Sequence, residues 1–154
     1  MNWDHKLLGL AQHYALWSKD PDHKVGCVLA DQYNQVMAGG YNGPPRFVID
    51  SWETKEEKVA RTVHAEINAL LFAKHDLKGA TAYIYPFLPC SQCMAALIQA
   101  GITRIVVAKD EISRKWNPMI TFAMADEAEI KIEVLHEFSK SKWNINNWAR
   151  HRNT

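Results

Sequence analysis

Two cysteines three positions apart follow a proline in the segment Pro89-Cys90-Ser91-Gln92-Cys93. Proline is favoured at the start of a helix, and side chains three positions apart share a helix face, so both thiols can reach one ion. A histidine upstream, in Thr62-Val63-His64-Ala65-Glu66, adds a third ligand of a type that zinc accepts. Three protein ligands leave one coordination position for water, which distinguishes catalytic from structural zinc sites. The sequence therefore predicts a zinc site made by His64, Cys90 and Cys93.

The paired cysteines alone have two other interpretations. A C-x-x-C motif is also typical of thioredoxin-like redox pairs, and a set of three ligands is consistent with an incomplete structural metal site. The occurrence of both His-x-Glu and Pro-Cys-x-x-Cys in one chain favours catalysis. Neither alternative gives a role to Glu66.

Both motifs are expected at the beginnings of helices. His64 and Glu66 are two positions apart and would diverge in the middle of a helix, so both must reach the metal from its first turn. Thr62 is predicted to be the N-cap of this helix, and Pro89 marks the start of the second one. The positive ends of two helix dipoles would then meet at the ion and favour deprotonated cysteine ligands.

The pattern H-x-E with P-C-x-x-C resembles the signature of zinc-dependent nucleobase deaminases. This resemblance implies hydrolytic deamination of an amino-substituted base, in which zinc activates a water molecule. Glu66 is then expected to be the catalytic acid and base. It would take the proton of the water and deliver it to a ring nitrogen and then to the departing amine.

The size and charge of the chain limit its class. Its 154 residues, 47% of them hydrophobic, suffice for one domain with a sizeable core. The net charge of +1 predicts a small-molecule substrate and no nucleic-acid partner. Three cysteines make no disulfide framework, and metal-binding thiolates suit a reducing compartment. Without a signal-peptide segment or an apolar run near the ~18 residues of a membrane span, the protein is predicted to be cytoplasmic, with no membrane partner.

Apolar periodicity predicts an α/β fold. Helical spacing indicates helices over 3–18 and beginning near 62, 90 and 117. Short apolar runs between turn residues indicate strands at 25–30, 35–41, 80–85, 104–108 and 130–135, of which the first two form a hairpin. The connection 42–61 has no clear period. This order of elements predicts a mixed five-stranded sheet covered by helices on both faces.

From about Ser18 to about Ala108 the chain resembles the deoxycytidylate deaminases of the cytidine deaminase superfamily. The matching stretches are Ser18-Lys19-Asp20-Pro21, Val25-Gly26, Gly40-Tyr41-Asn42-Gly43-Pro44, His64-Ala65-Glu66-Ile67-Asn68-Ala69, Pro89-Cys90-x-x-Cys93 and Gln99-Ala100-Gly101-Ile102. The resemblance implies a three-layer α/β/α fold and the zinc-dependent conversion of dCMP to dUMP with release of ammonia, in pyrimidine deoxynucleotide metabolism. It divides the chain into a deaminase domain, 1–138, and a C-terminal helix or tail, 139–154.

The same resemblance implies assembly and regulation. Deoxycytidylate deaminases are homo-oligomers, commonly hexamers, and many are activated by dCTP and inhibited by dTTP. In this chain the effector site is expected near Gly40, Tyr41, Asn42 and Gly43. Mg²⁺ would accompany a nucleoside triphosphate effector.

Candidate substrate contacts follow from position and chemistry. Asn42, at the end of a predicted strand, can bind a sugar hydroxyl or a base edge; the alternative is a turn residue. The amide of Ala65, between a ligand and the catalytic acid, can bind the carbonyl of cytosine. A monophosphate needs a cation, for which Lys19, Arg114 and Lys115 are candidates in predicted loops. Each of these three is also consistent with an ordinary solvated side chain.

Three other functions remain open. A polynucleotide deaminase acting on tRNA adenosine or DNA cytosine would share the zinc chemistry but needs a flipped base and a basic track. A salvage enzyme for free cytidine, guanine or a related base would share the motifs. A noncatalytic zinc-stabilised binding module would keep the three ligands but would not require Glu66.

Overall fold

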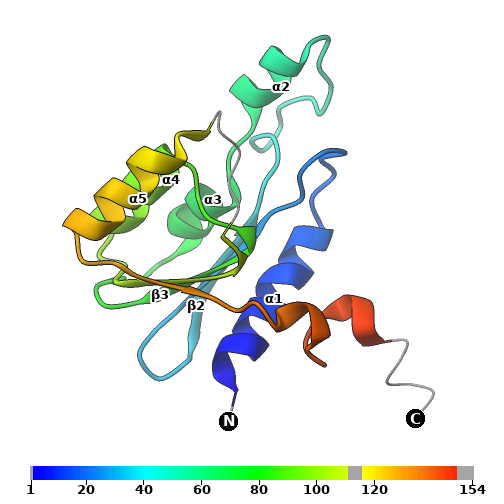
Figure 1. The fold of residues 1–154 in the computed structure, drawn as a ribbon. Helices are drawn as coiled ribbons and strands as arrows, with labels where there is room; N and C mark the ends of the chain where they lie inside the picture. The colour runs from blue at the N-terminus through cyan, green and yellow to red at the C-terminus, as the bar shows by residue number, and fades with distance from the viewer. Residues whose placement is uncertain (1, 111–115, 149–154) are drawn as a thin grey trace.

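A computed structural model of the chain describes residues 2–110 and 116–148 (Figure 1). The helices are α1 (Trp3–Leu16), α2 (Lys55–Arg61), α3 (Ala65–Phe72), α4 (Ser91–Gln99) and α5 (Pro118–Glu127), with short 3-10 helices η2 (Phe138–Lys140) and η3 (Ile145–Asn147). The strands are β1 (Gly26–Ala30), β2 (Val36–Tyr41), β3 (Thr81–Phe87), β4 (Arg104–Lys109) and β5 (Lys131–Val134). Within the described part of the chain, no helix has the length and apolar character needed to cross a membrane.

The five strands form one sheet in the order β2-β1-β3-β4-β5. Strand β1 pairs antiparallel with β2 and β3, whereas β4 pairs parallel with β3 and β5. All five residues of β1 are buried, as expected for a strand covered on both faces. The prediction of a mixed five-stranded α/β sheet is confirmed.

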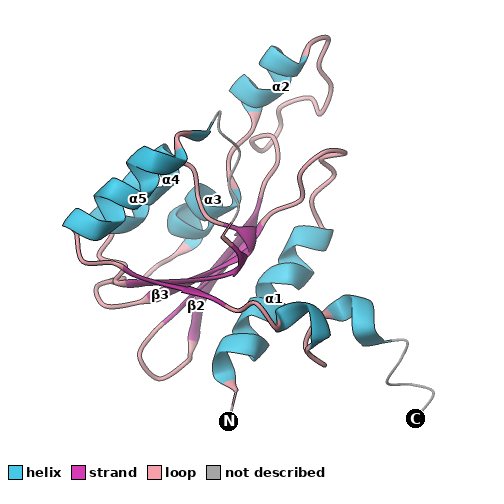
Figure 2. Cartoon of the chain, viewed as in Figure 1, coloured by secondary structure: helices cyan, strands magenta, loops and turns pink. Residues whose placement is uncertain are grey.

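Helices cover both faces of this sheet, which makes three layers (Figure 2). One face packs against α1, where Leu7, Leu8 and Ala11 meet Val28 and Tyr83 in a buried cluster. The other face packs against α3, α4 and α5, through a second buried cluster that includes Leu29, Ile84, Met94, Leu97 and Val107. The two clusters place the beginnings of α3 and α4 on the same face of the sheet.

The described part of the C-terminal segment is attached to α1. The Gln12 side chain donates to Oδ1 of Asn144 at 3.1 Å and accepts from the Ile145 amide at 2.8 Å. Gln12 and Asn144 are both buried, and Phe138 fills the space beside α1. Because a buried amide pair with both partners satisfied gives one defined arrangement, residues 138–148 have a fixed place on the domain.

The connection before α3 differs from the prediction, because it contains the short helix α2. Thr54 caps α2 by accepting from the Glu57 amide at 3.1 Å, and the Glu57 carboxylate accepts from the Glu53 amide at 3.0 Å. The prediction that Thr62 is the N-cap of α3 is wrong: Thr62 ends α2 and donates to the Lys58 carbonyl at 2.7 Å. Helix α2 buries none of its residues, so no apolar period indicates it.

Gly40 sets the distance between β2 and α3. A Cβ at this position would lie 2.7 Å from the Ala69 nitrogen and 2.8 Å from the Ala65 oxygen, both backbone atoms. Gly40→Ala is therefore expected to lower the free energy of unfolding by about 1 to 3 kcal/mol, because α3 must move away from the sheet. Urea denaturation measures this loss. Gly43→Ala is the matched control, since a Cβ there has no neighbour within 4 Å, and an equal loss in both variants would contradict the explanation.

Candidate active site

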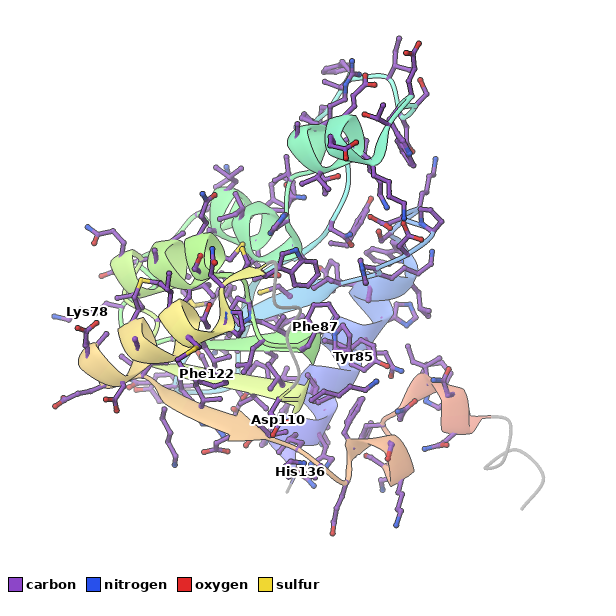
Figure 3. The ribbon with its side chains drawn as sticks, turned by 45° about the horizontal axis from the view of Figure 1, so that its top comes forward. Lys78, Tyr85, Phe87, Asp110, Phe122 and His136 are labelled. Atoms are coloured by element: carbon purple, nitrogen blue, oxygen red, sulfur yellow. The ribbon has the colours of Figure 1, made fainter. Side chains whose placement is uncertain are left out.

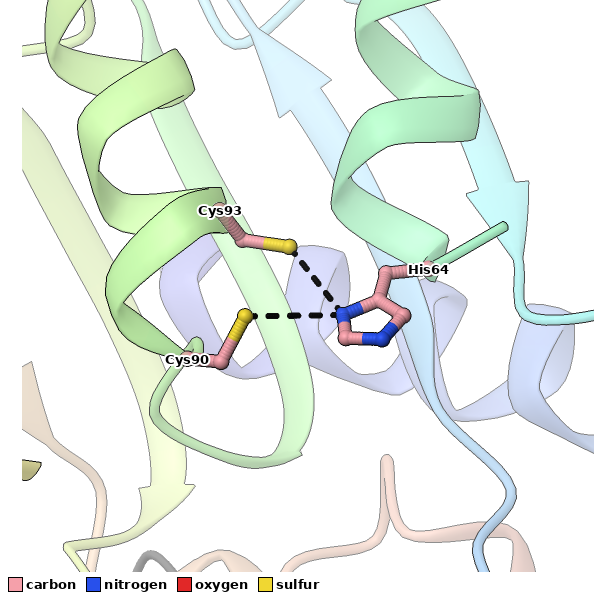
Figure 4. Close-up of side chains that lie close together, drawn as sticks. All are labelled: His64, Cys90 and Cys93. Carbon is pink, nitrogen blue, oxygen red and sulfur yellow. Dashed lines mark hydrogen bonds between the residues drawn. The ribbon is translucent and has the colours of Figure 1, made fainter. Parts of the chain in front are cut away.

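The three predicted zinc ligands lie together at the beginnings of two helices. His64 occupies the N-cap position of α3 and Cys90 that of α4, both with extended backbone, while Cys93 is in the first turn of α4. The Nδ1 atom of His64 lies 3.5 Å from Cys90 Sγ and 3.3 Å from Cys93 Sγ (Figure 4). The ligand atoms of the three residues all lie within 4.8 Å of one another. The structure thus brings together residues that are up to 29 positions apart in the sequence.

These distances fit a tetrahedral zinc site. Zinc bonds of about 2.3 Å to sulfur and about 2.0 Å to nitrogen, at tetrahedral angles, place a nitrogen and a sulfur ligand roughly 3.5 Å apart. The two observed separations, 3.5 and 3.3 Å, are close to this value without any movement of the helices. One imidazole and two thiols form a donor set that zinc prefers, and the cysteines are free. The convergence of His64 on both sulfurs favours metal binding over a redox pair.

The protein environment stabilises a thiolate in this cluster. Hydrogen bonds to Cys90, first from the Cys93 thiol and then from His64, lower the pKa of Cys90 to about 4. The same shared proton raises the pKa of Cys93, which is also buried. The pKa of His64 is raised chiefly by its hydrogen bond to Cys90. Zinc binds cysteine as the thiolate, so zinc affinity at this cluster is expected to rise with pH.

Glu66 lies beside the three ligands in the first turn of α3, with only 4% of its surface exposed. Burial raises the pKa of Glu66, while the nearby His64 and Cys93 act in the opposite direction. A carboxyl group accepts a proton when ionised and donates one when protonated. The structure thus places Glu66 next to the three predicted ligands, and its acid and base role stays a prediction.

A cavity of about 760 Å³ opens over this cluster. Its lining includes His64, Glu66 and Cys90 as well as residues of α2 and of the 20–23 loop. Cavities of about 300 to 1,000 Å³ are typical of small-molecule sites. The volume is in this range, and Glu66 is part of the lining.

Two predicted substrate contacts line this cavity. Asn42 is 6% exposed; its Oδ1 accepts from the Val25 amide at 2.9 Å and its Nδ2 donates to the His23 carbonyl at 2.8 Å. The side chain thus holds the loop before β1 and keeps one N–H and one lone pair for a ligand. Ala65 is fully buried at the first position of α3, where backbone amides have no partner within the helix.

Of the three predicted phosphate cations, only Lys19 lies in the part of the chain that the structure describes. Lys19 is exposed and does not line the cavity, while Arg114 and Lys115 lie outside the described residues. Among the residues that the structure describes, the lysines that line the cavity are Lys55 and Lys58 of α2. Sequence reasoning missed both because α2 itself has no apolar period.

Three rings from separate elements form one wall of the cavity. Phe87 is the last residue of β3 (Figure 3). Its ring lies 5.2 Å from that of Trp116, and His23 lies 5.4 Å from Trp116 and 6.3 Å from Phe87. Aromatic faces of this kind bind planar rings. No sequence pattern links these positions, since they lie in two loops and a strand end.

The predicted effector stretch has structural contacts. Gly40 packs against α3, and the Tyr41 carbonyl accepts from the Asn68 side chain at 2.8 Å. The Tyr41 ring is 40% exposed and meets Trp17 edge to face. Gly43 pairs with Val63 in an isolated antiparallel bridge.

Comparisons with known proteins agree with this geometry. Residues 1–109 match the family model described as the cytidine and deoxycytidylate deaminase zinc-binding region. The chain is 34% identical over 136 residues to an "uncharacterized deaminase in luxG 3′ region" of Aliivibrio fischeri, covering 86% of this chain and 91% of that protein. It is 32% identical over 120 residues to the human protein named deoxycytidylate deaminase, covering 72% and 67% of the two chains.

Solved structures share the fold. The dCMP deaminase of cyanophage S-TIM5, in its complex with dCMP and dUMP, superposes with a TM-score of 0.71 at 20% identity, covering 83% of this chain and 93% of that one. RibD of Acinetobacter baumannii superposes with a TM-score of 0.61 at 25% identity, covering 86% and 35%. The family match spans the His64, Cys90 and Cys93 cluster as well as Glu66. This chain belongs to the cytidine and deoxycytidylate deaminase family of zinc-binding proteins.

Proposed function

We propose that this chain catalyses the hydrolytic deamination of dCMP to dUMP and ammonia, with one zinc ion held by His64, Cys90 and Cys93. The observation that carries the proposal is the buried Glu66 beside the three converging ligand atoms, at one end of a cavity of about 760 Å³. A binding module would not need a buried carboxyl group of raised pKa at this point. The relatives named deoxycytidylate deaminase support dCMP as the substrate.

Glu66 carries out the proton transfers of the proposed reaction. Zinc, when bound, supplies Lewis acidity that makes water a nucleophile near neutral pH. Glu66 accepts a proton from the attacking water and donates it to ring nitrogen N3 of cytosine. It then moves a second proton from the new C4 hydroxyl to the amino group, which leaves as ammonia while the C4 carbonyl of uracil forms. Each step uses the same carboxylate, so acid and base roles alternate.

Binding groups orient the base and the sugar for this transfer. The Ala65 amide, free of helical partners, is placed to donate to the cytosine carbonyl. Asn42 has one N–H and one lone pair left for a sugar hydroxyl, while its other contacts fix its position. The wall made by His23, Phe87 and Trp116 offers a face for the pyrimidine ring.

Lys55 is the proposed phosphate contact. Among the described residues it lines the cavity without an ion pair to a carboxylate, whereas Lys58 is paired with Asp20 and Asp22. Two charge-assisted hydrogen bonds of about 1.5 to 3 kcal/mol each correspond to at least about a hundredfold preference for dCMP over deoxycytidine in kcat/KM. Lys55→Met is expected to lower kcat/KM for dCMP about tenfold and to leave deoxycytidine nearly unchanged. Equal use of both substrates by the wild-type protein would contradict the nucleotide assignment.

The decisive test of function is a deamination screen with zinc-loaded protein. Ammonia release is measured with dCMP, CMP, deoxycytidine, cytidine, guanine and a tRNA adenosine oligomer. The proposal predicts the highest kcat/KM with dCMP. A preference for deoxycytidine, cytidine or guanine would assign a salvage enzyme, and a preference for the oligomer would assign a polynucleotide deaminase.

Assembly and regulation are also proposed, each from a small set of exposed residues. A homo-oligomer, with a hexamer as the specific expectation, is supported by exposed apolar side chains of α5, namely Met119, Ile120 and Phe122. Regulation by dCTP and dTTP, with Mg²⁺ accompanying the triphosphate, would act through the exposed Tyr41 and its neighbours. The free cysteines support a reducing compartment such as the cytoplasm.

A further inference from the structure

We infer that Lys58 is a positioning residue, whose ion pairs with Asp20 and Asp22 hold helix α2 in place as a wall of the substrate cavity. The effect on KM rests on the proposed deaminase function. The effect on the position of α2 rests on the geometry alone. Lys58 comes from α2, and the two aspartates come from the loop between α1 and β1. We call this set of three residues the clasp.

Helix α2 has little else to hold it. The segment 44–62 leaves the domain and returns at the Gly43–Val63 bridge, whose amides bond each other's carbonyls at 3.1 and 2.8 Å. Between these ends α2 extends away from the sheet (Figure 1) and buries none of its residues. Among the residues that the structure describes, the α2 side-chain hydrogen bonds that leave this segment are those of Lys58. Because no core packing fixes α2, the clasp has to determine its position.

The clasp has the geometry of a strong contact. Lys58 Nζ lies 2.7 Å from Asp20 Oδ1 and 3.1 Å from Asp22 Oδ2. The Lys58 and Asp20 side chains are each 11% exposed, so water competes little for this pair, whereas Asp22 is 52% exposed. Asp20 is itself fixed, since its Oδ1 accepts from the amides of Asp22 at 2.8 Å and His23 at 3.0 Å. A charged pair that is protected from water is worth far more than an exposed one.

The clasp joins two walls of the same cavity. Asp20, Asp22 and His23 line it from the loop, and Lys55, Lys58 and Val59 line it from α2. Val59 is 67% exposed, so packing does not hold it at the cavity. Its place there depends on the position of α2. If the clasp opened, the wall that carries Lys55 would move away from a bound substrate.

The charges of the clasp argue against Lys58 as a direct phosphate ligand. Two carboxylates surround one ammonium group, and the Trp52 ring lies 5.6 Å from its nitrogen. A phosphate at this point would have to displace a carboxylate or accept its repulsion. Lys58 therefore acts on the substrate through the position of α2.

The test compares Lys58→Met, Asp20→Asn and the double variant, each zinc-loaded, with dCMP and with deoxycytidine. Asn at position 20 is isosteric and keeps the oxygen that accepts from Asp22 and His23, so the loop should persist. Each single variant should raise KM for both substrates about tenfold, as expected for one lost charge-assisted bond, with kcat within about twofold of wild type. The double variant should be no worse than Lys58→Met, because the contact with Asp20 is one of the two that Lys58→Met already removes.

Two further variants control the test. Lys58→Arg keeps the cation and should recover most of the affinity. Arg61→Met removes a cation of the same helix whose partner, Glu57, also lies on α2, and it should change neither KM value. Asp22→Asn should have a smaller effect than Asp20→Asn, because Asp22 is more exposed and its contact is longer.

Other outcomes would overturn the inference. If Lys58→Met raised KM for dCMP alone and Asp20→Asn lowered it, Lys58 would be a phosphate ligand. If both variants lost thermal stability without any change in KM, the clasp would have a purely structural role. Hydrogen exchange of the amides of residues 55–61 needs no activity, and it should accelerate in Lys58→Met but not in Arg61→Met. Faster exchange in a protein without deaminase activity would refute the proposed function while keeping the clasp.

Discussion

Replacement of Glu66 by Gln is expected to reduce the turnover of dCMP by at least about a hundredfold, the usual contribution of a positioned proton shuttle. Glu66 is only 4% exposed, and Gln has nearly the same shape, so the substitution should fit the buried site. Gln can neither accept nor release a proton at neutral pH. The zinc content should stay near one ion per chain, because His64, Cys90 and Cys93 are unchanged. Ammonia release at saturating dCMP measures the turnover, and metal analysis of the same sample measures the zinc content.

A matched variant separates loss of chemistry from loss of charge. Glu127→Gln removes an exposed carboxylate at the end of α5, away from the cavity lining, and should leave turnover unchanged. Full turnover by a zinc-loaded Glu66→Gln protein would show that another group moves the proton.

Replacement of Cys93 by Ala should weaken zinc binding by more than about a hundredfold and should remove deaminase activity with it. The loss of a direct ligand exceeds the 10- to 100-fold cost typical of losing a group that only supports one. The fold should also lose stability, since metal binding joins the beginnings of α3 and α4. Zinc competition with a chelator and thermal unfolding with and without zinc measure both effects.

Cys27→Ala is the control for the removal of a buried thiol. Cys27 is as inaccessible as Cys93, but it lies in the middle of β1 and is not part of the cluster. This variant should keep its zinc and its activity. A Cys90–Cys93 disulfide in freshly purified, reduced protein that binds no zinc would support a redox pair instead.

The sequence was sufficient for the chemistry because the motifs are local. His64 and Glu66 are predicted in the first turn of one helix, and Cys90 and Cys93 at the start of another, so local helix geometry brings each pair together. Each motif can be recognised from its own spacing, without the rest of the chain. The placement of Asn42 at the cavity follows in the same way from the end of β2.

The opposite wall of the cavity could not be predicted in this way. Lys58 meets Asp20 across 38 positions of sequence, and nothing in either segment indicates the other. The sequence predicts Lys19 as a phosphate cation, yet its neighbour Asp20 lines the cavity, whereas Lys19 is exposed and does not. The position of an exposed helix without an apolar face depends on tertiary contacts and not on a period, so only the folded chain identifies Lys55 and Lys58 of α2.

The central claim, that His64, Cys90 and Cys93 hold the zinc on which deamination of dCMP depends, is tested most directly by a zinc titration. Metal-free protein receives zinc in steps up to two ions per chain, and ammonia release from dCMP is measured at each step. The rate should rise from zero in proportion to bound zinc and level off at one ion per chain. Turnover that is already complete without zinc, or no ammonia from the fully loaded protein, would contradict the claim.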